Sequence, residues 1–370
     1  GGVSGCVSTE LNVFDWLKFE SDISELKKVA IAILALLCVL MVNMFQCCLP
    51  GGGEDLEESA RWMTNADAKL LAMPLNRVAL VGSHNSGSYA KRARSKCHSG
   101  DCDRNLAKYL KIPPVGFVVR RWAKCQKISI LRQLEHGIRY LDIRVQIHES
   151  EMHLCHSLCF LDAEAMMDQL VTFLDAKPHE LVVVDVNHAY SDVEGGHEKF
   201  LNIFLQRIGR SRVATPTSHT PSSTLQSFRD AGVQVVLIYD EPGAAANANV
   251  WGPSTIVSVW PNLPTAEQVL EHGRGLLLEE VDEEETRLRV LQLLPTPAGK
   301  DLARYISVLH FSSTIVRLAP KWLKDLCTKE QIALSRANIV LMDDAVHGKN
   351  ALFRSLQELN EFKSKNYTSN

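Results

Sequence analysis

From residue 61 onward, short apolar segments alternate with amphipathic ones, and this alternation restricts the possible folds more than any other feature of the chain. Eight apolar segments have the length and composition of strands: Val78–Val81, Ile138–Ile147, Met152–Leu158, Leu181–Val186, Val233–Tyr239, Ile256–Trp260, Ile306–Phe311 and Ile339–Met342. Helical spacing appears between several of them, as in Ala163–Leu174. Strands that alternate with helices in this way predict an α/β fold, a TIM-like (β/α)8 barrel.

Length, charge and cysteine content exclude several classes of protein. The 370 residues suffice for one large barrel domain. A formal net charge of −3 provides no bulk attraction to nucleic acid, so none is expected as a partner. The ten cysteines are scattered, and no pair of CxxC units occurs at the spacing of a zinc finger.

The N-terminal region contains an apolar stretch that predicts a membrane segment. Residues 29–42 are continuously apolar, and the run continues more weakly to residue 49, about the length needed to cross a bilayer. Lys27 and Lys28 precede it and acidic residues follow it, so the positive-inside rule orients the main domain outward. We therefore expect a single-pass membrane protein with its barrel outside or in a lumen. A cleaved signal segment or a buried helix is the alternative, which would leave a secreted or cytoplasmic barrel.

These features divide the chain into five parts. They are a tail (1–28), a transmembrane or signal-anchor segment (29–49), a linker (50–60), the barrel (61–363) and a second tail (364–370).

A polar cluster follows the first predicted strand directly. The stretch from Val78 to Tyr89 reads VALVGSHNSGSY, so the strand breaks at Gly82 and then presents His84 and Asn85. An α/β enzyme places catalytic groups at such a position, because the strand is rigid and its C-terminal end is open. A capped loop with a surface histidine is the structural alternative.

The second predicted strand carries two charges that share one face. In QLEHGIRYLDIRV, alternation puts Asp142 and Arg144 on the same side of the strand. Barrel interiors prefer branched apolar side chains, so two inward charges indicate a functional site. An inward ion pair with a purely structural role is the alternative.

Further polar residues end other strands. His153 and His156 are three residues apart and face opposite sides of a strand, and His156 lies nearer its C-terminal end. Asn187, Asp240 and Asp343 lie at the ends of later strands. Histidines, an arginine and carboxylates at one end of a barrel are the groups required for general acid–base attack on a phosphodiester.

These segments resemble a known family. SHNSGS, QLEHGIRYLDIRV, HLCHSL and PHELVVVDVNHAY are similar to the X-domain of phosphatidylinositol-specific phospholipases C, above all to the small X-domain-only proteins. LQSFRDAGVQVVLIYDE, VWPN and NIVLMDD have counterparts in the same order, so the resemblance covers roughly residues 61–360. It implies a TIM-like barrel and a phosphoric diester hydrolase. That enzyme cleaves phosphatidylinositol-like lipids by 2-hydroxyl attack, giving a cyclic inositol phosphate and diacylglycerol.

The resemblance implies a catalytic role for each of five residues. His84 corresponds to the general base that deprotonates the inositol 2-hydroxyl, and Asp343 to the aspartate that orients it. His156 corresponds to the general acid that protonates the departing diacylglycerol oxygen. Arg144 corresponds to the arginine that stabilises the phosphoryl oxygens, with Asp142 as its carboxylate neighbour.

The same positions predict a site without metal or other cofactor. Calcium-dependent members use an Asn after the first His, an acid pair on the second strand and a later Glu. Here Asn85 and Asp142 fit, but Arg144 replaces the second acid and Asn187 the Glu, so a cation would be repelled. We expect Asn85, Asn187 and Asp240 to bind substrate instead.

Residues 91–127 are expected to contact a membrane surface. This segment contains eleven Lys and Arg residues against two Asp, together with Tyr109, Phe117 and Trp122. A basic rim attracts anionic lipid, and aromatic side chains add interfacial contact. A solvated surface loop is the alternative. The expected partners are thus a phosphatidylinositol-type phospholipid and a membrane surface.

One departure from the family pattern supports an alternative function. Metal-independent members usually have Asp directly after the first His, where this chain has Asn85. An amide cannot stabilise an imidazolium by charge. The alternative is therefore a catalytically weak X-domain protein that acts as a lipid-headgroup or membrane-binding module.

Overall fold

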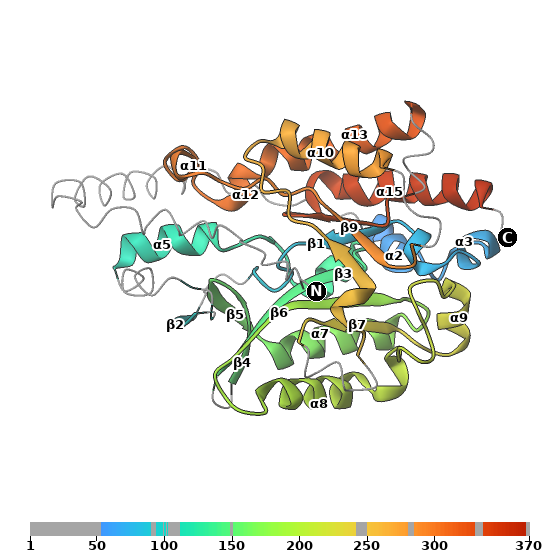
Figure 1. Ribbon diagram of the computed structural model, residues 1–370, viewed down its shortest axis with the longest axis horizontal. Helices are drawn as coiled ribbons and strands as arrows, with labels where there is room; N and C mark the ends of the chain where they lie inside the picture. Colours follow the sequence, from blue (N-terminus) through green and yellow to red (C-terminus); the bar gives the residue numbers. More distant parts are fainter. Residues whose placement is uncertain are drawn as a thin grey trace, which may run out of the picture.

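The computed structural model describes residues 53–89, 94–98, 100, 102, 112–148, 151–241, 250–279, 285–329 and 336–367 (Figure 1). Its centre is a sheet of parallel strands in which each neighbouring pair runs in the same direction. In spatial order these strands are β8 (Ile256–Ser258), β9 (Leu288–Gln292), β10 (Ile339–Met342), β1 (Leu80–Ser83), β3 (Tyr140–His148), β6 (Val182–Ser191) and β7 (Val235–Tyr239). A parallel bridge between Ile238 and Trp251 extends this order beyond β7.

Helices cover the strands on opposite sides. In Figure 1, α10, α13 and α15 lie above the strands, whereas α7 and α8 lie below them. The main helices are α6 (Ile130–Glu135), α7 (Ala163–Ala176), α8 (Gly196–Ile208), α9 (Leu225–Asp230), α10 (Ala266–Leu278), α13 (Ser313–Lys329) and α15 (His347–Asn366). Shorter elements are α2 (Gly53–Ala60), α3 (Ala68–Leu71), η2 (Leu75–Arg77), α5 (Pro113–Trp122), η3 (Arg210–Arg212), η5 (Pro253–Thr255), α11 (Gly299–Arg304) and α12 (Val308–Phe311). This arrangement is the predicted TIM-like barrel.

An antiparallel extension grows from the far end of β3. β4 (Glu151–His156) pairs with β3, β5 (Leu158–Asp162) pairs with β4, and β2 (Arg94–His98) pairs with β5, all antiparallel. The segment predicted as Met152–Leu158 therefore contains most of β4 and the first residue of β5, and it folds back along β3 without adding to the parallel order. This return brings His156 toward the carboxyl end of the parallel strands.

One predicted strand is a helix, and one strand was not predicted. Residues 306–311 contain the helix α12, because Ser307 caps it by accepting a hydrogen bond from the His310 amide (3.1 Å). The strand β9 was not predicted, because its sequence LRVLQ includes two polar side chains that are only half-buried.

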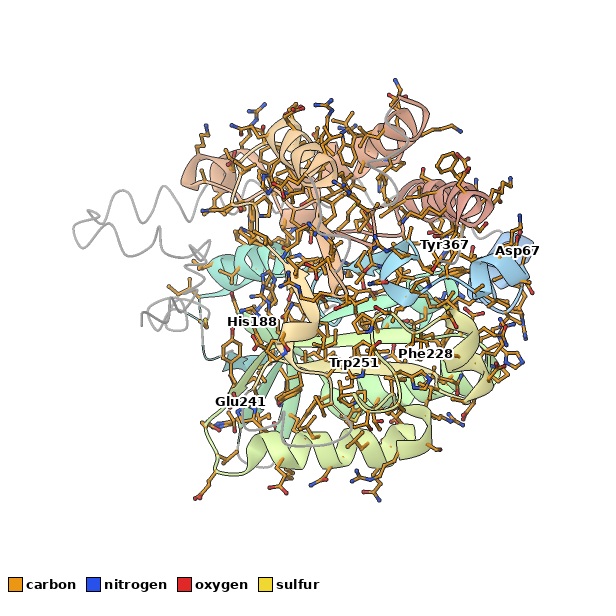
Figure 2. All side chains as sticks on the ribbon, turned by 45° about the vertical axis from the view of Figure 1, so that its right-hand side comes forward. Asp67, His188, Phe228, Glu241, Trp251 and Tyr367 are labelled. Carbon is orange, nitrogen blue, oxygen red and sulfur yellow. The ribbon has the colours of Figure 1, made fainter. Side chains whose placement is uncertain are left out.

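The interior is closely packed where strands meet. A Cβ at Gly82 would lie 2.9 Å from the Tyr140 ring, so only glycine fits at this point of β1. Trp251 and Phe228 are each 1% exposed and lie on the β7 side of the core (Figure 2). These contacts hold the strands that carry the polar residues at their ends.

The predicted membrane segment requires correction. Residues 29–49 lie outside the described residues, and none of the helices within those residues is both long and apolar enough to cross a bilayer. The predicted fold is therefore corrected: the barrel is retained, and the transmembrane segment is withdrawn because no described helix supports it. The predicted single-pass localisation, with the barrel outside or lumenal, depended on that segment and is corrected with it.

Two elements cross the predicted domain boundaries. α2 forms within the stretch predicted as a linker, and α15 runs to Asn366, beyond the predicted end of the barrel. Trp62 follows α2 and is 6% exposed, and its Nε1 donates to the Gly137 carbonyl (3.2 Å).

The basic segment is described only in part, and Tyr109 lies outside the described residues. Trp122, at the end of α5, is buried against Phe311, with ring centroids 6.1 Å apart. The expectation that Trp122 contacts a membrane interface was therefore wrong. The guanidinium of Arg121 lies over the ring of Phe117, 5.4 Å from its centroid.

Candidate active site

The carboxyl ends of β1, β3, β6 and β10 meet at one edge of the barrel. His84 follows β1, Asp142 and Arg144 belong to β3, Asn187 to β6, and Asp343 follows β10. Because parallel strands end at the same side of a barrel, these five residues are brought together.

His84 is oriented by a buried carboxylate. Its Nδ1 lies 2.7 Å from Asp343 Oδ1, and Ser312 Oγ donates to Asp343 Oδ2 (2.6 Å). A carboxylate accepts, so Nδ1 carries the hydrogen and Nε2 has the lone pair. All three side chains are buried. This arrangement selects the tautomer that a general base requires.

Asn85 occupies the space next to that lone pair. Its Nδ2 donates to His84 Nε2 (2.7 Å) and lies 3.9 Å from the sulfur of Cys125. Its backbone has φ = 43°, a left-handed conformation that asparagine tolerates better than most residues. The tight turn after β1 thus directs the amide into the site.

Asp142, on β3, connects the loop after β1 to β6. Its Oδ2 accepts a hydrogen bond from the Asn85 amide (2.8 Å) and is 4.0 Å from His84 Nε2. Its Oδ1 accepts from Asn187 Nδ2 (2.6 Å). The register between β3 and β6 shifts at this point, which redirects Asn187 toward Asp142.

His156 enters the site from the antiparallel extension. Its Nδ1 is 3.0 Å from the Ala123 carbonyl and 3.4 Å from Cys125 Sγ. A carbonyl only accepts, so this nitrogen carries the hydrogen. The rings of His84 and His156 are 5.8 Å apart and nearly perpendicular. Arg144 is buried, and its positive charge lowers the pKa of His156.

Cys125 changes the electrostatics of both histidines. Burial lowers the pKa of His84, but Cys125 and Asp343 outweigh it and hold that pKa well above its usual value. Burial likewise lowers the pKa of His156, and Cys125 raises it above the usual value. Burial raises the pKa of the Cys125 thiol, but the charge of His156 brings it below the usual value. The three groups therefore interact as one cluster.

Of the eight predicted site residues, only Asp240 has no described contact within the cluster. It lies after β7 and is exposed. The nearby Asp185 is buried, and Tyr140 donates to its Oδ2 (2.5 Å). Burial raises the pKa of Asp185 to about 7, with further contributions from Asp142 and Asp240.

Three neighbours of the histidines were not predicted. Cys125 and Ser312 belong to no strand-end motif, and no local signal in the sequence marks them. Trp260, whose ring is 5.9 Å from that of His84, lies in the VWPN segment and could have been found there.

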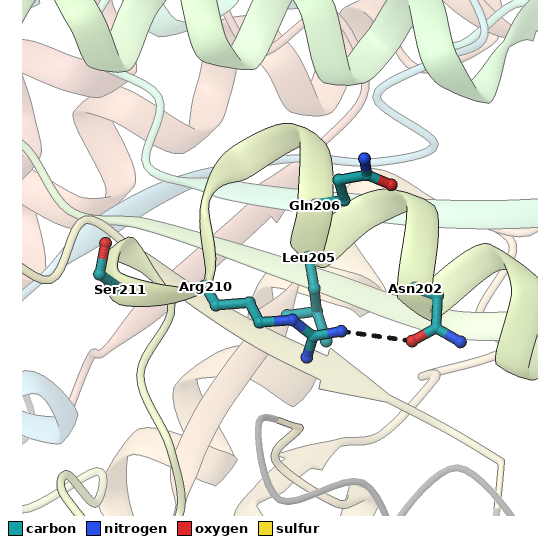
Figure 3. A pocket seen from close by; sticks show the side chains of 5 residues that line it. All are labelled: Asn202, Leu205, Gln206, Arg210 and Ser211. Atoms are coloured by element: carbon teal, nitrogen blue, oxygen red, sulfur yellow. Dashed lines mark hydrogen bonds between the residues drawn. The ribbon is translucent and has the colours of Figure 1, made fainter.

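A nitrogen of His84, the sulfur of Cys125 and an oxygen of Asp343 all lie within 4.8 Å of one another, and all three residues are buried. A surface pocket elsewhere is lined by Asn202, Leu205, Gln206, Arg210 and Ser211 (Figure 3). There Arg210 donates to Asn202 (3.4 Å), and none of the strand-end residues contributes. The strand-end residues at the barrel edge therefore form the candidate site.

Comparison with known proteins agrees with this architecture. Residues 102–250 match the family model PI-PLC X 1. The PI-PLC X domain-containing protein 2 of Mus musculus is 27% identical over 300 residues, covering 80% of this chain and 86% of the relative. The variant-surface-glycoprotein phospholipase C of Trypanosoma brucei brucei is 26% identical over 259 residues, covering 65% of this chain and 71% of the relative.

A solved structure has the same fold. The phosphatidylinositol-specific phospholipase C of Staphylococcus aureus superposes with a TM-score of 0.59 at 18% identity, covering 81% of this chain and 98% of that one. This similarity supports the barrel architecture. Together, the family model and the curated relatives show that the chain is similar to the PI-PLC X domain family, with the family model matching residues 102–250.

Proposed function

We propose that this protein is a phospholipase C-type phosphoric diester hydrolase that cleaves phosphatidylinositol-like lipids. The observation that carries the proposal is the pair His84 and His156, with ring centroids 5.8 Å apart at the barrel edge, together with the buried Arg144 on β3. The names of the trypanosome relative and of the staphylococcal neighbour agree with this class of reaction.

In the first step, His84 acts as general base. Its Nε2 takes the proton from the inositol 2-hydroxyl, whose oxygen attacks phosphorus and forms a cyclic phosphate. Asp343 holds Nδ1–H and stabilises the imidazolium that results. The substrate hydroxyl must displace the Asn85 amide from Nε2, because both compete for the same lone pair.

His156 completes the step as general acid. Its Nδ1 donates to the Ala123 carbonyl, so the protonated ring presents Nε2–H to the departing diacylglycerol oxygen. Cys125 raises the pKa of this ring above its usual value, which favours the protonated form that a general acid requires. The proton removed by one histidine is thus balanced by the proton supplied by the other.

Arg144 supplies the positive charge that the phosphoryl oxygens need in the transition state. Asp142 is a poor calcium ligand here, because its two oxygens already accept hydrogen bonds from Asn85 and Asn187. These contacts support turnover without calcium.

A basic surface beside the site is suited to anionic lipid. α5 carries Arg120 and Arg121 in its last turn. Ile112 precedes the same helix and is 46% exposed. Cationic and exposed apolar side chains together favour adsorption to a negatively charged bilayer.

One observation favours a second candidate function, a lipid-headgroup or membrane-binding module of weak activity. Asn85 already occupies the lone pair of the base, and the described polar contacts of the His156 ring are a carbonyl and a sulfur. Such a site would bind a phosphorylated headgroup without rapid turnover.

The test is release of water-soluble inositol phosphate from phosphatidylinositol vesicles in EDTA. We expect wild type to release a cyclic product, and both His84→Ala and His156→Ala to lose at least about a hundredfold in rate. His179→Ala, an exposed substitution on a turn preceding β6, should retain wild-type activity.

Each contrary result is informative. Vesicle binding without any product from wild type would favour the binding module. Turnover that disappears in EDTA and returns with calcium would contradict the metal-independent mechanism. Normal turnover by both histidine variants would overturn the assigned roles.

A further inference from the structure

Cys125 is held rigidly in the middle of the site, and the proposed reaction gives it no proton to transfer. Its side chain is fully buried. Its backbone nitrogen donates to Ser88 Oγ (3.1 Å), and its carbonyl accepts from the Asp344 amide (3.0 Å). The sulfur is thereby fixed between the loops that follow β1 and β10.

Around this sulfur lie nitrogen donors at ligand spacing. His156 Nδ1 is 3.4 Å from Cys125 Sγ. Zinc–nitrogen and zinc–sulfur bonds arranged tetrahedrally place two such ligand atoms about 3.5 Å apart. A nitrogen of His84 falls within the 4.8 Å group that also contains the sulfur. For all three donors to bind one ion, His156 Nδ1 must lose its hydrogen and its contact with the Ala123 carbonyl, and the side chains must shift slightly.

Asp343 provides the outer support that metal-bound histidines usually have. Its carboxylate accepts the hydrogen of His84 Nδ1 (2.7 Å), which directs the Nε2 lone pair inward. A carboxylate, a histidine and a metal in this order form the common second-shell arrangement of zinc sites.

The buried Asn85 side chain independently indicates that an ion binds here. It is 1% exposed, its amide points at His84 Nε2 and Cys125 Sγ, and its Oδ1 has no hydrogen-bond partner among the described residues. A half-turn of the amide exchanges nitrogen for oxygen at the same place. The oxygen would then complete the set of donors.

We propose that His84, Cys125 and His156 form a binding site for a thiophilic divalent cation such as Zn²⁺, with Asn85 as a fourth donor. One thiolate and two imidazoles prefer zinc over calcium or magnesium, which require oxygen ligands. The thiolate also supplies the negative charge that offsets the repulsion of a cation by the buried Arg144. Occupation blocks both histidines, so the cation acts as an inhibitor. Binding stands independently of the proposed function, and only the inhibition rests on it.

The test uses Co²⁺ as a spectroscopic probe of the reduced, chelator-treated full chain. We expect wild type to bind one equivalent with a thiolate-to-cobalt charge-transfer band, and Zn²⁺ to displace it. Cys125→Ser should lose the band and weaken Zn²⁺ binding at least tenfold. Asp343→Asn should weaken binding about 10–100-fold while keeping the band.

Cys155→Ser is the matched control, because this buried cysteine precedes His156 on β4 and lies outside the proposed ligand set. It should keep the band. Absence of the band in wild type, its persistence in Cys125→Ser or its loss in Cys155→Ser would overturn the site. If the protein proves not to cleave lipid, these spectra still decide whether the cation binds.

Discussion

At the scale of single residues, burial makes the properties of a side chain depend on its partners. Asp185 is 2% exposed and accepts a hydrogen bond from Tyr140 (2.5 Å). Its pKa is raised from 3.8 to about 7, mainly by burial. Between about pH 4 and pH 7 the folded protein therefore holds a proton that the unfolded chain has released.

This difference makes Asp185 reduce stability as pH rises through that window, because the unfolded state binds fewer protons. In Asp185→Asn, the free energy of unfolding should fall less as pH rises. The difference from wild type should be a few kcal/mol, the order expected for a pKa shift of this size. Urea unfolding of both proteins at about pH 5 and pH 8 measures the effect. The exposed substitution Asp230→Asn is the control, and equal pH slopes in wild type and Asp185→Asn would contradict the prediction.

At the scale of elements, the starts of β3 and β6 are joined by a buried ion pair. Arg139 Nη2 lies 2.7 Å from Glu180 Oε2, and both side chains are 0% exposed. Arg139 Nε also donates to Glu180 Oε2 (3.0 Å), while Nη1 and Nη2 donate to backbone carbonyls. Glu180 also accepts from the amides of Met63 and Thr64. The pair thus connects two strands to the segment after α2.

Removing one charge should destabilise this junction. In Glu180→Gln the Arg139 charge stays buried without its counter-ion, so the free energy of unfolding should fall by about 3–5 kcal/mol. Glu135→Gln breaks the exposed pair with Arg132 and should change it by less than about 1 kcal/mol. Urea denaturation compares the two. A loss in Glu180→Gln no larger than in the control would refute a structural role.

At the scale of the whole molecule, the last helix closes the barrel onto its first strand. Asn360 on α15 accepts from the Ala79 amide (2.7 Å) and donates to the Ala79 carbonyl (2.9 Å). Lys363 donates to the Arg77 carbonyl (2.9 Å). These contacts join segments about 280 residues apart, since Asn360 and Ala79 differ by 281 positions.

Asn360→Ala leaves a buried amide and a buried carbonyl without partners. Each unpaired group costs about 1–3 kcal/mol, so we expect a loss of roughly 2–4 kcal/mol in the free energy of unfolding. Glu361→Ala, at an exposed position of the same helix, should have little effect. Thermal and urea unfolding provide the comparison, and equal stabilities would contradict the closing role of α15.

Most of the barrel could be predicted because its strands carry local signals. The apolar runs that become β1, β3, β6, β7 and β10 are largely buried and followed by polar residues, and the run that becomes β8 is apolar although only half-buried. β9 was not predicted, because its half-buried polar side chains interrupt the apolar pattern. Residues 306–311 were predicted as a strand, but an apolar run can form a helix when a residue such as Ser307 caps it.

The residue types at the strand ends were determined by the sequence alone: His84 after β1, Asp142 and Arg144 on β3, Asp343 after β10. Alternation and strand ends depend only on neighbouring positions, so they can be read locally. Tertiary structure decided which of them meet, and it added Cys125 and Ser312 from segments without any motif. The distances between these groups depend on how distant segments pack, and no local pattern contains that information.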